Sequence, residues 1–115
     1  MAIPHAISGQ IVDLHPLAAP LAAEKSIALF KSQDLEVMRL VLPAGRSLPA
    51  HRVAGEITIQ CLDGAISVSA DGTDHVLRAG QMLYLVRNVL YAMLALEDAS
   101  ALVTVALVRS PESGT

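Results

Sequence analysis

Two short runs in which apolar and polar residues alternate constrain the fold of this chain more than any other feature. In residues 56–62 and again in residues 66–70, apolar side chains occupy every second position. A period of two residues is typical of a β-strand whose two faces meet different environments. The pair Asp63–Gly64 separates the runs, and both of its residues tolerate a positive φ. The sequence therefore predicts two strands joined by a tight hairpin turn.

Further short apolar runs occur along the chain, and Asp71–Gly72 marks the next turn. We expect strands at residues 26–30, 35–42, 56–62, 66–70, 82–86, 89–96 and 102–108. Short strands at such spacing favour an all-β sandwich or barrel. The runs after residue 80 are apolar on both faces, which indicates that a second sheet or a second subunit covers them. Pro43, Gly45 and Pro49 predict an irregular connection leading into His51.

The first 25 residues give a weaker pattern. Gln10 to Leu14 could form a strand, and Leu17 to Glu24 could form one or two helical turns. Pro16 and Pro20 interrupt any longer helix. There is no internal repeat and no low-complexity linker, so a chain of 115 residues has room for one domain.

Composition predicts an aliphatic core and a self-association surface. Apolar residues make up 53% of the chain, yet it has only two tyrosines, one phenylalanine and no tryptophan. So small a domain cannot hide that much aliphatic surface inside itself. Part of it should therefore form an interface between subunits, most simply in a two-fold homodimer.

Charge and cysteine content exclude several classes of partner. The net charge of -3 leaves no basic stripe, which argues against nucleic-acid binding. The single cysteine, Cys61, cannot form an internal disulfide. The first ten residues lack the features of a signal peptide, and no apolar run approaches the roughly 18 residues of a membrane span. We therefore expect a cytoplasmic protein without nucleic-acid or membrane partners.

Two segments resemble the signatures of the cupin family. The first signature has the pattern glycine, five residues, histidine, one residue, histidine, three residues, glutamate, six residues, glycine. The segment GRSLPAHRVAGEITIQCLDG fits it at Gly45, His51 and Gly64. The second signature resembles GQMLYLVRNVLYAMLA, which keeps only its first glycine, Gly80. The resemblance covers about residues 35–108.

This resemblance implies an all-β fold, the cupin double-stranded β-helix or jelly-roll barrel, with an N-terminal extension. On that basis residues 1–34 would form the extension and first strands, a candidate part of a dimer interface. Residues 35–110 would form the barrel, and residues 111–115 a C-terminal tail.

In the cupin family two histidines, the glutamate and a later histidine bind a metal ion, commonly iron, manganese, nickel or zinc. The corresponding positions here are His51, Val53, Ile57 and Tyr91. Val53 and Ile57 offer no lone pair, whereas catalytic zinc sites keep three protein ligands. Glu56 cannot replace the missing carboxylate unless a bulge re-aims it, because neighbours on a strand point to opposite faces. We therefore expect no metal cofactor.

Two hypotheses of function follow. The first is a metal-free homodimer, without assigned catalytic residues, whose barrel is either packed shut or open as a pocket for a small apolar or weakly polar molecule. Such a pocket would be lined by His51, Val53, Ile57, Ile59, Tyr91 and Met93. The alternative is a metal-dependent enzyme of the isomerase or dioxygenase type acting on a small molecule, which requires ligands that this chain does not supply at the family positions.

Individual side chains carry further expectations. His51 either binds a molecule or acts as an acid or base, or it is satisfied by the backbone or by Tyr91, and we expect it to contact Tyr91. Cys61 should be a buried small hydrophobic residue. Arg39 interrupts an apolar strand, and we expect it on the solvent face or at an interface rim, with binding of a carboxylate in a pocket as the alternative.

Overall fold

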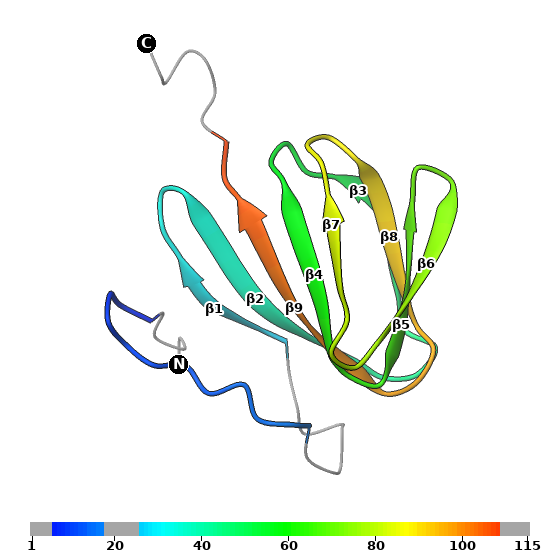
Figure 1. Cartoon of the computed structure of the whole chain (residues 1–115), viewed down its shortest axis with the longest axis horizontal. Coiled ribbons are helices and arrows are strands. Elements are labelled where there is room, and N and C mark those ends of the chain that lie inside the picture. Colours follow the sequence, from blue (N-terminus) through cyan, green and yellow to red (C-terminus); the bar gives the residue numbers. More distant parts are fainter. Residues whose placement is uncertain (1–5, 18–25, 109–115) are drawn as a thin grey trace.

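A computed structural model describes residues 6–17 and 26–108, which form nine β-strands (Figure 1). The strands are β1 (Ile27–Lys31), β2 (Leu35–Leu42), β3 (Ser47–Arg52), β4 (Ile57–Asp63), β5 (Ala65–Ala70), β6 (Thr73–Arg78), β7 (Met82–Leu85), β8 (Leu90–Ala95) and β9 (Ala99–Ala106). They build a five-stranded sheet in the order β1-β2-β9-β4-β7 and a four-stranded sheet in the order β3-β8-β5-β6. The predicted all-β fold is confirmed. No helix with the length and apolarity to cross a membrane occurs in the described ranges.

The core fills the space between the inner faces of the two sheets. Alternate residues of β4, namely Ile57, Ile59 and Cys61, are only 2%, 0% and 0% exposed. Ile66 and Val68 of β5 meet them from the four-stranded sheet within the same hydrophobic cluster. The core is aliphatic, as the composition predicts, and the expected burial of Cys61 is confirmed.

The predicted hairpin at Asp63–Gly64 is wrong. β4 belongs to the five-stranded sheet and β5 to the four-stranded sheet, so the chain crosses between the sheets at this corner. Gly64 has a φ of 73°, and a Cβ there would lie 2.1 Å from the carbonyl oxygen of Asp98. The hairpin is instead at Asp71–Gly72, where φ values of 50° and 79° join the paired strands β5 and β6. Two successive positive φ values are typical of hairpin turns.

The irregular connection predicted before His51 is confirmed for residues 43–46, which form a turn between β2 and β3, but it is wrong from Ser47 on. Residues 47–52 form β3, which lies at the edge of the four-stranded sheet and pairs with β8. The pairing shifts register between Leu48 and His51, the stretch that contains Pro49. Proline has no N–H to donate, and edge strands and bulges are where sheets accept it. The sequence pattern also gave no expectation of β6.

Residues 6–17, called the arm below, run beside β1 and reach the end of β4 (Figure 1). Gln10–Leu14, a candidate strand, has no strand geometry. At one end the Ala6 N–H donates to the carbonyl oxygen of Leu29 in β1 (2.9 Å). At the other end the Leu17 N–H donates to Asp63 Oδ1 at the end of β4 (3.4 Å). The helical turns predicted up to residue 24, and the tail 111–115, lie outside the described residues.

Two glycine substitutions test the corner between the sheets. Gly72→Ala should destabilise the protein by about 1–2 kcal/mol, because the left-handed conformation disfavours a Cβ. Gly64→Ala should cost about 3 kcal/mol or more, since the added methyl group also collides with the backbone of Asp98. Urea denaturation of both variants measures the difference. Equal losses of stability would contradict the crossing geometry described here.

Candidate functional site

His51 and Tyr91, two of the four positions that match the metal ligands of cupins, lie side by side. They are register partners on β3 and β8, and their ring centroids are 4.6 Å apart with the planes inclined by 50°. The expected contact between them is confirmed. His51 itself is exposed, and its Nδ1 lies 3.3 Å from the carbonyl oxygen of Pro49. Its imidazole therefore lies at the rim of the barrel, open to solvent.

The other residues of the predicted pocket belong to the hydrophobic core. Ile57, Ile59, Tyr91 and Met93 are 2%, 0%, 4% and 3% exposed, and all belong to one cluster. Val53 is half-buried and packs against that cluster. The fold thus brings the six predicted residues together. Five of them belong to the core or pack against it, and His51 contacts one of these five, Tyr91.

The donor atoms of this set do not fit a catalytic metal ion. Val53 and Ile57 are hydrocarbon, so His51 and Tyr91 would supply one nitrogen and one phenol oxygen. Glu56 is exposed and accepts a hydrogen bond from the Tyr84 hydroxyl, so its carboxylate is turned away from the core, as expected. No group of three or more histidine, cysteine or acidic side chains placed to hold a metal occurs within residues 6–17 and 26–108. Three protein ligands are the usual minimum for catalytic zinc.

Burial of Tyr91 determines the protonation state of its phenol. Desolvation raises the pKa of the Tyr91 phenol above its usual value of about 10. The group is therefore neutral at physiological pH and acts as a hydrogen-bond donor or acceptor rather than as an anionic ligand. With the exposed His51 imidazole above it, the pair can anchor an uncharged polar group.

Next to this pair, two hydrogen bonds join the end of β3 to the turn between β7 and β8. The Asn88 N–H donates to the carbonyl oxygen of Val53 (3.0 Å), and Arg52 Nη1 donates to the carbonyl oxygen of Asn88. Asn88 has a φ of 63°, in the left-handed region that few residues other than glycine and asparagine adopt. We call His51, Arg52, Val53 and Asn88, together with the Tyr91 ring, the barrel mouth.

The hollows described on the protein surface lie outside the hydrophobic core, and one of them, of about 210 Å³, is lined in part by Arg52 and Tyr91 of the barrel mouth. Spaces of about 190 and 410 Å³ separate the arm from β1 and the turn after it. Two others, of about 210 and 290 Å³, lie on the outer face of the four-stranded sheet, where both are lined by Ser69 and Ala92. A ligand pocket inside the barrel therefore stays a prediction.

Arg39 forms a buried polar cluster that its sequence context did not predict. It is 7% exposed, so the expected place on a solvent face or interface rim is wrong. Its Nη2 donates to Asp63 Oδ2 (3.0 Å) and to Ser100 Oγ (3.2 Å), and the Ser100 hydroxyl donates to the same carboxylate. The alternative, binding of a carboxylate in a pocket, is not what the structure shows either, because the carboxylate that Arg39 binds belongs to Asp63 of this chain. The one available signal was that Arg39 and Ser100 each interrupt an apolar run.

Comparisons with solved structures identify the fold. A conserved protein of unknown function from Streptococcus pyogenes matches with a TM-score of 0.72 and 18% identity, over 96% of this chain and 97% of that chain. An RmlC-like cupin from Shewanella frigidimarina matches with a TM-score of 0.68 and 18% identity, over 74% of this chain and 77% of that chain. KdgF from a Halomonas species matches with a TM-score of 0.66 and 18% identity, over 76% of this chain and 81% of that chain.

These similarities show that the chain has the cupin fold, the double-stranded β-helix. The resemblance seen in the two signatures is thereby confirmed at the level of fold. At 18% identity they carry no statement of activity. No family model matches the sequence, and no curated protein matches it.

A double-mutant cycle tests the polar cluster. Asp63→Ala should lower the free energy of unfolding by about 3 kcal/mol, because it leaves the guanidinium of Arg39 buried without its anion. The double variant Arg39→Met/Asp63→Ala should recover at least about 1 kcal/mol of that loss, since no unpaired charge remains. Urea denaturation measures both changes. Arg46→Met, at an exposed arginine, is the control and should stay within about 0.5 kcal/mol of the wild type.

Proposed function

We propose that this protein is a metal-free, non-catalytic homodimer of the cupin fold that binds a small apolar or weakly polar molecule at the barrel mouth. One observation carries the proposal. At the four positions where cupins hold their metal, two side chains are aliphatic and pack into the core or against it, namely Val53 and Ile57. Hydrocarbon cannot coordinate a cation, so the remaining imidazole and neutral phenol are left to act as hydrogen-bonding groups.

The barrel mouth supports this choice of ligand chemistry. Small-molecule sites combine an apolar lining with a few polar groups that fix orientation. Here Val53 supplies half-buried apolar surface, while His51 and Tyr91 supply one exposed and one buried polar group. The core beneath is filled by side chains, which favours a ligand that rests at the mouth over one that is enclosed.

The distribution of apolar surface supports the homodimer. Large hydrophobic side chains on both sheets and on the arm are at least 40% exposed, among them Leu35, Val76, Met82, Tyr84, Leu90 and Leu94. β7 was predicted to be covered on both faces, yet Met82 and Tyr84 on one of its faces are 61% and 54% exposed. A second subunit would supply the missing cover. A cytoplasmic location stays a prediction from the sequence.

Metal content tests the metal-free part of the proposal. Untagged protein should contain less than about 0.1 metal ion per chain by elemental analysis, and added Zn²⁺, Ni²⁺, Mn²⁺ or Fe²⁺ should not raise its Tm, because two ligands cannot hold the ion. The variant Val53→His/Ile57→Glu/Tyr91→His restores the family ligands and should gain metal-dependent stability. Stoichiometric metal in the wild type that disappears in His51→Ala would support the metal-dependent isomerase or dioxygenase instead.

A fragment screen tests the ligand site. Uncharged aromatic alcohols and lactones at millimolar concentration, added to ¹⁵N-labelled protein, should shift the amide signals of residues 51–53 and 88–91. His51→Ala should weaken that binding about tenfold, the loss expected when one hydrogen-bond anchor is removed. His75→Ala, a histidine on β6 outside the mouth, is the matched control and should bind as the wild type does. Shifts confined to other regions would refute the mouth as the site.

A further inference from the structure

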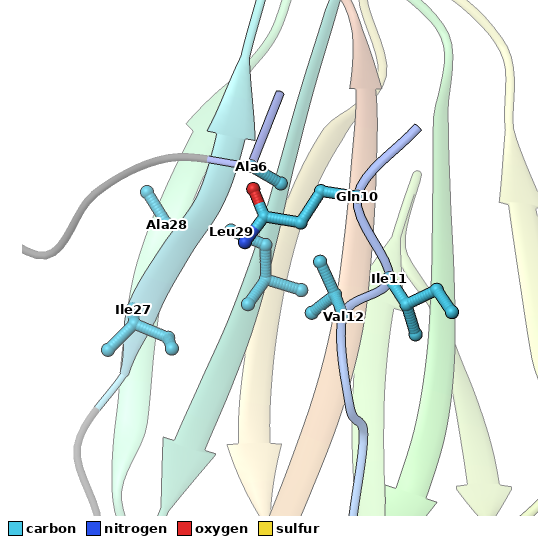
Figure 2. Close-up of a pocket in the computed structure, with 7 residues that line it drawn as sticks. All are labelled: Ala6, Gln10, Ile11, Val12, Ile27, Ala28 and Leu29. Carbon is cyan, nitrogen blue, oxygen red and sulfur yellow. The ribbon is translucent and has the colours of Figure 1, made fainter. Parts of the chain in front are cut away.

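One of the four hollows described above is lined by charged residues of both signs. It is the hollow of about 210 Å³ on the outer face of the four-stranded sheet, where Arg52 of β3 and Asp71 of the turn between β5 and β6 both belong to its lining. The hollow beside β1 (Figure 2) has an uncharged lining, and the other two contain either Lys31 or Asp74. Of these four hollows, only the first can therefore offer a cation and an anion to the same ligand.

The two charged residues do not neutralise each other. In the described part of the chain, the only ion pair is the one between Arg39 and Asp63. The Asp71 carboxylate accepts no hydrogen bond from another described residue, and the Arg52 guanidinium donates only through Nη1, to the carbonyl oxygen of Asn88. Both oxygens of Asp71 and the Nε and Nη2 atoms of Arg52 are therefore available to a ligand.

The sheet places these two residues on either side of Leu90 in β8. Arg52 is the register partner of Leu90 on one side, and on the other side the Asp71 N–H donates to the carbonyl oxygen of Leu90 (3.4 Å). Two strand spacings, about 10 Å, separate the backbones of Arg52 and Asp71. The bond to Asn88 and the hairpin turn, in which Asp71 has a φ of 50°, hold both residues in place. Preset charges of this kind lose less freedom when a ligand binds.

Uncharged residues form the lining between the two charges. Leu90 is 43% exposed, and Ala92 and Ser69 are half-buried. Leu90 and Ala92 offer apolar contact to a short aliphatic group, and the Ser69 hydroxyl can donate a hydrogen bond. A cavity of about 150 Å³ admits benzene, so this hollow admits a ligand of about eight non-hydrogen atoms.

We propose that this hollow binds a small aliphatic α-amino acid of about the size of valine, whose carboxylate pairs with Arg52 and whose ammonium group pairs with Asp71. The planar fork of the guanidinium matches the two oxygens of a carboxylate. Asp71 repels a simple anion and Arg52 repels a simple cation, so the hollow favours a ligand that carries both charges. His51 is not part of the lining, so the inference goes beyond the uncharged ligand proposed for the barrel mouth and does not depend on it.

Titration of ¹⁵N-labelled protein with L-valine tests the assignment. Valine should shift the amide signals of Arg52, Ser69, Asp71 and Leu90 with a Kd of about 1–10 mM, as expected for a small ligand in an open site. N-acetyl-L-valine lacks the ammonium charge and L-valinamide lacks the carboxylate, so each should bind at least about tenfold more weakly. Shifts confined to other residues, or equal binding of the three compounds, would overturn the proposal.

Two variants remove one charge each from the hollow. Arg52→Gln and Asp71→Asn should each weaken valine binding at least about tenfold. Asparagine tolerates the positive φ of Asp71, so circular dichroism of Asp71→Asn should show an unchanged fold. Arg87→Gln and Asp74→Asn make the same changes at exposed residues outside this lining, and they should keep the Kd within about twofold of the wild-type value. Unchanged valine binding in Asp71→Asn would refute the site.

The variant His51→Ala separates this site from the ligand site proposed at the barrel mouth. It should keep the Kd for valine within about twofold of the wild-type value, because His51 does not line the hollow, while its affinity for the uncharged fragments falls. Loss of valine binding in His51→Ala would place valine at the mouth and overturn the inference. Valine binding in a protein that binds none of the uncharged fragments would refute the mouth site alone.

Discussion

The packing of aliphatic side chains between two antiparallel sheets is the interaction on which the rest of this structure depends. β4 is central to it, because its inward residues Ile57 and Ile59 are almost fully buried in the cluster that joins both sheets. Burial of one such side chain contributes about 1.5–3 kcal/mol relative to exposure. Ile57 also stands where cupins carry the metal-binding glutamate. A carboxylate there would need a cation or another partner, whereas an isoleucine stabilises the barrel by itself.

On the outer face of the five-stranded sheet, the buried contact is an ion pair between Arg39 and Asp63. Met38 and Leu40 of β2 pack against the core, so Arg39 between them points outward. It is buried there nonetheless, because it pairs with Asp63 next to the corner between the sheets and the arm reaches the same carboxylate through Leu17. Its Nε is buried without an acceptor among the described residues. One ion pair thus links β2, the sheet corner and the N-terminal arm.

Local sequence patterns predicted the buried strands and not the topology. The strand ranges at 35–42, 56–62 and 66–70 were close to the observed β2, β4 and β5, because inward and outward side chains differ in polarity there. β3 and β6 were missed, since β3 contains Pro49 and most residues of both strands are exposed. A hairpin and a corner both accept Asp–Gly with positive φ, so the local pattern could not tell which sheet β5 would join. The contact between His51 and Tyr91 was predictable only because the family resemblance placed both residues at the same site.

Aliphatic side chains at two of the positions that match the cupin metal ligands change what the fold has to maintain. A catalytic barrel must keep polar donors and an open coordination position in its interior, which opposes close packing. With Val53 and Ile57 at those positions, apolar side chains fill the interior. The polar side chain of His51 then lies at the rim, where it is exposed and contacts Tyr91. Large apolar side chains are exposed on the arm and also on β6, β7 and β8, among them Val76, Met82 and Leu90. In the proposed function, ligand binding would take place at the rim, because side chains such as Ile57 and Met93 fill the core beneath His51 and Tyr91.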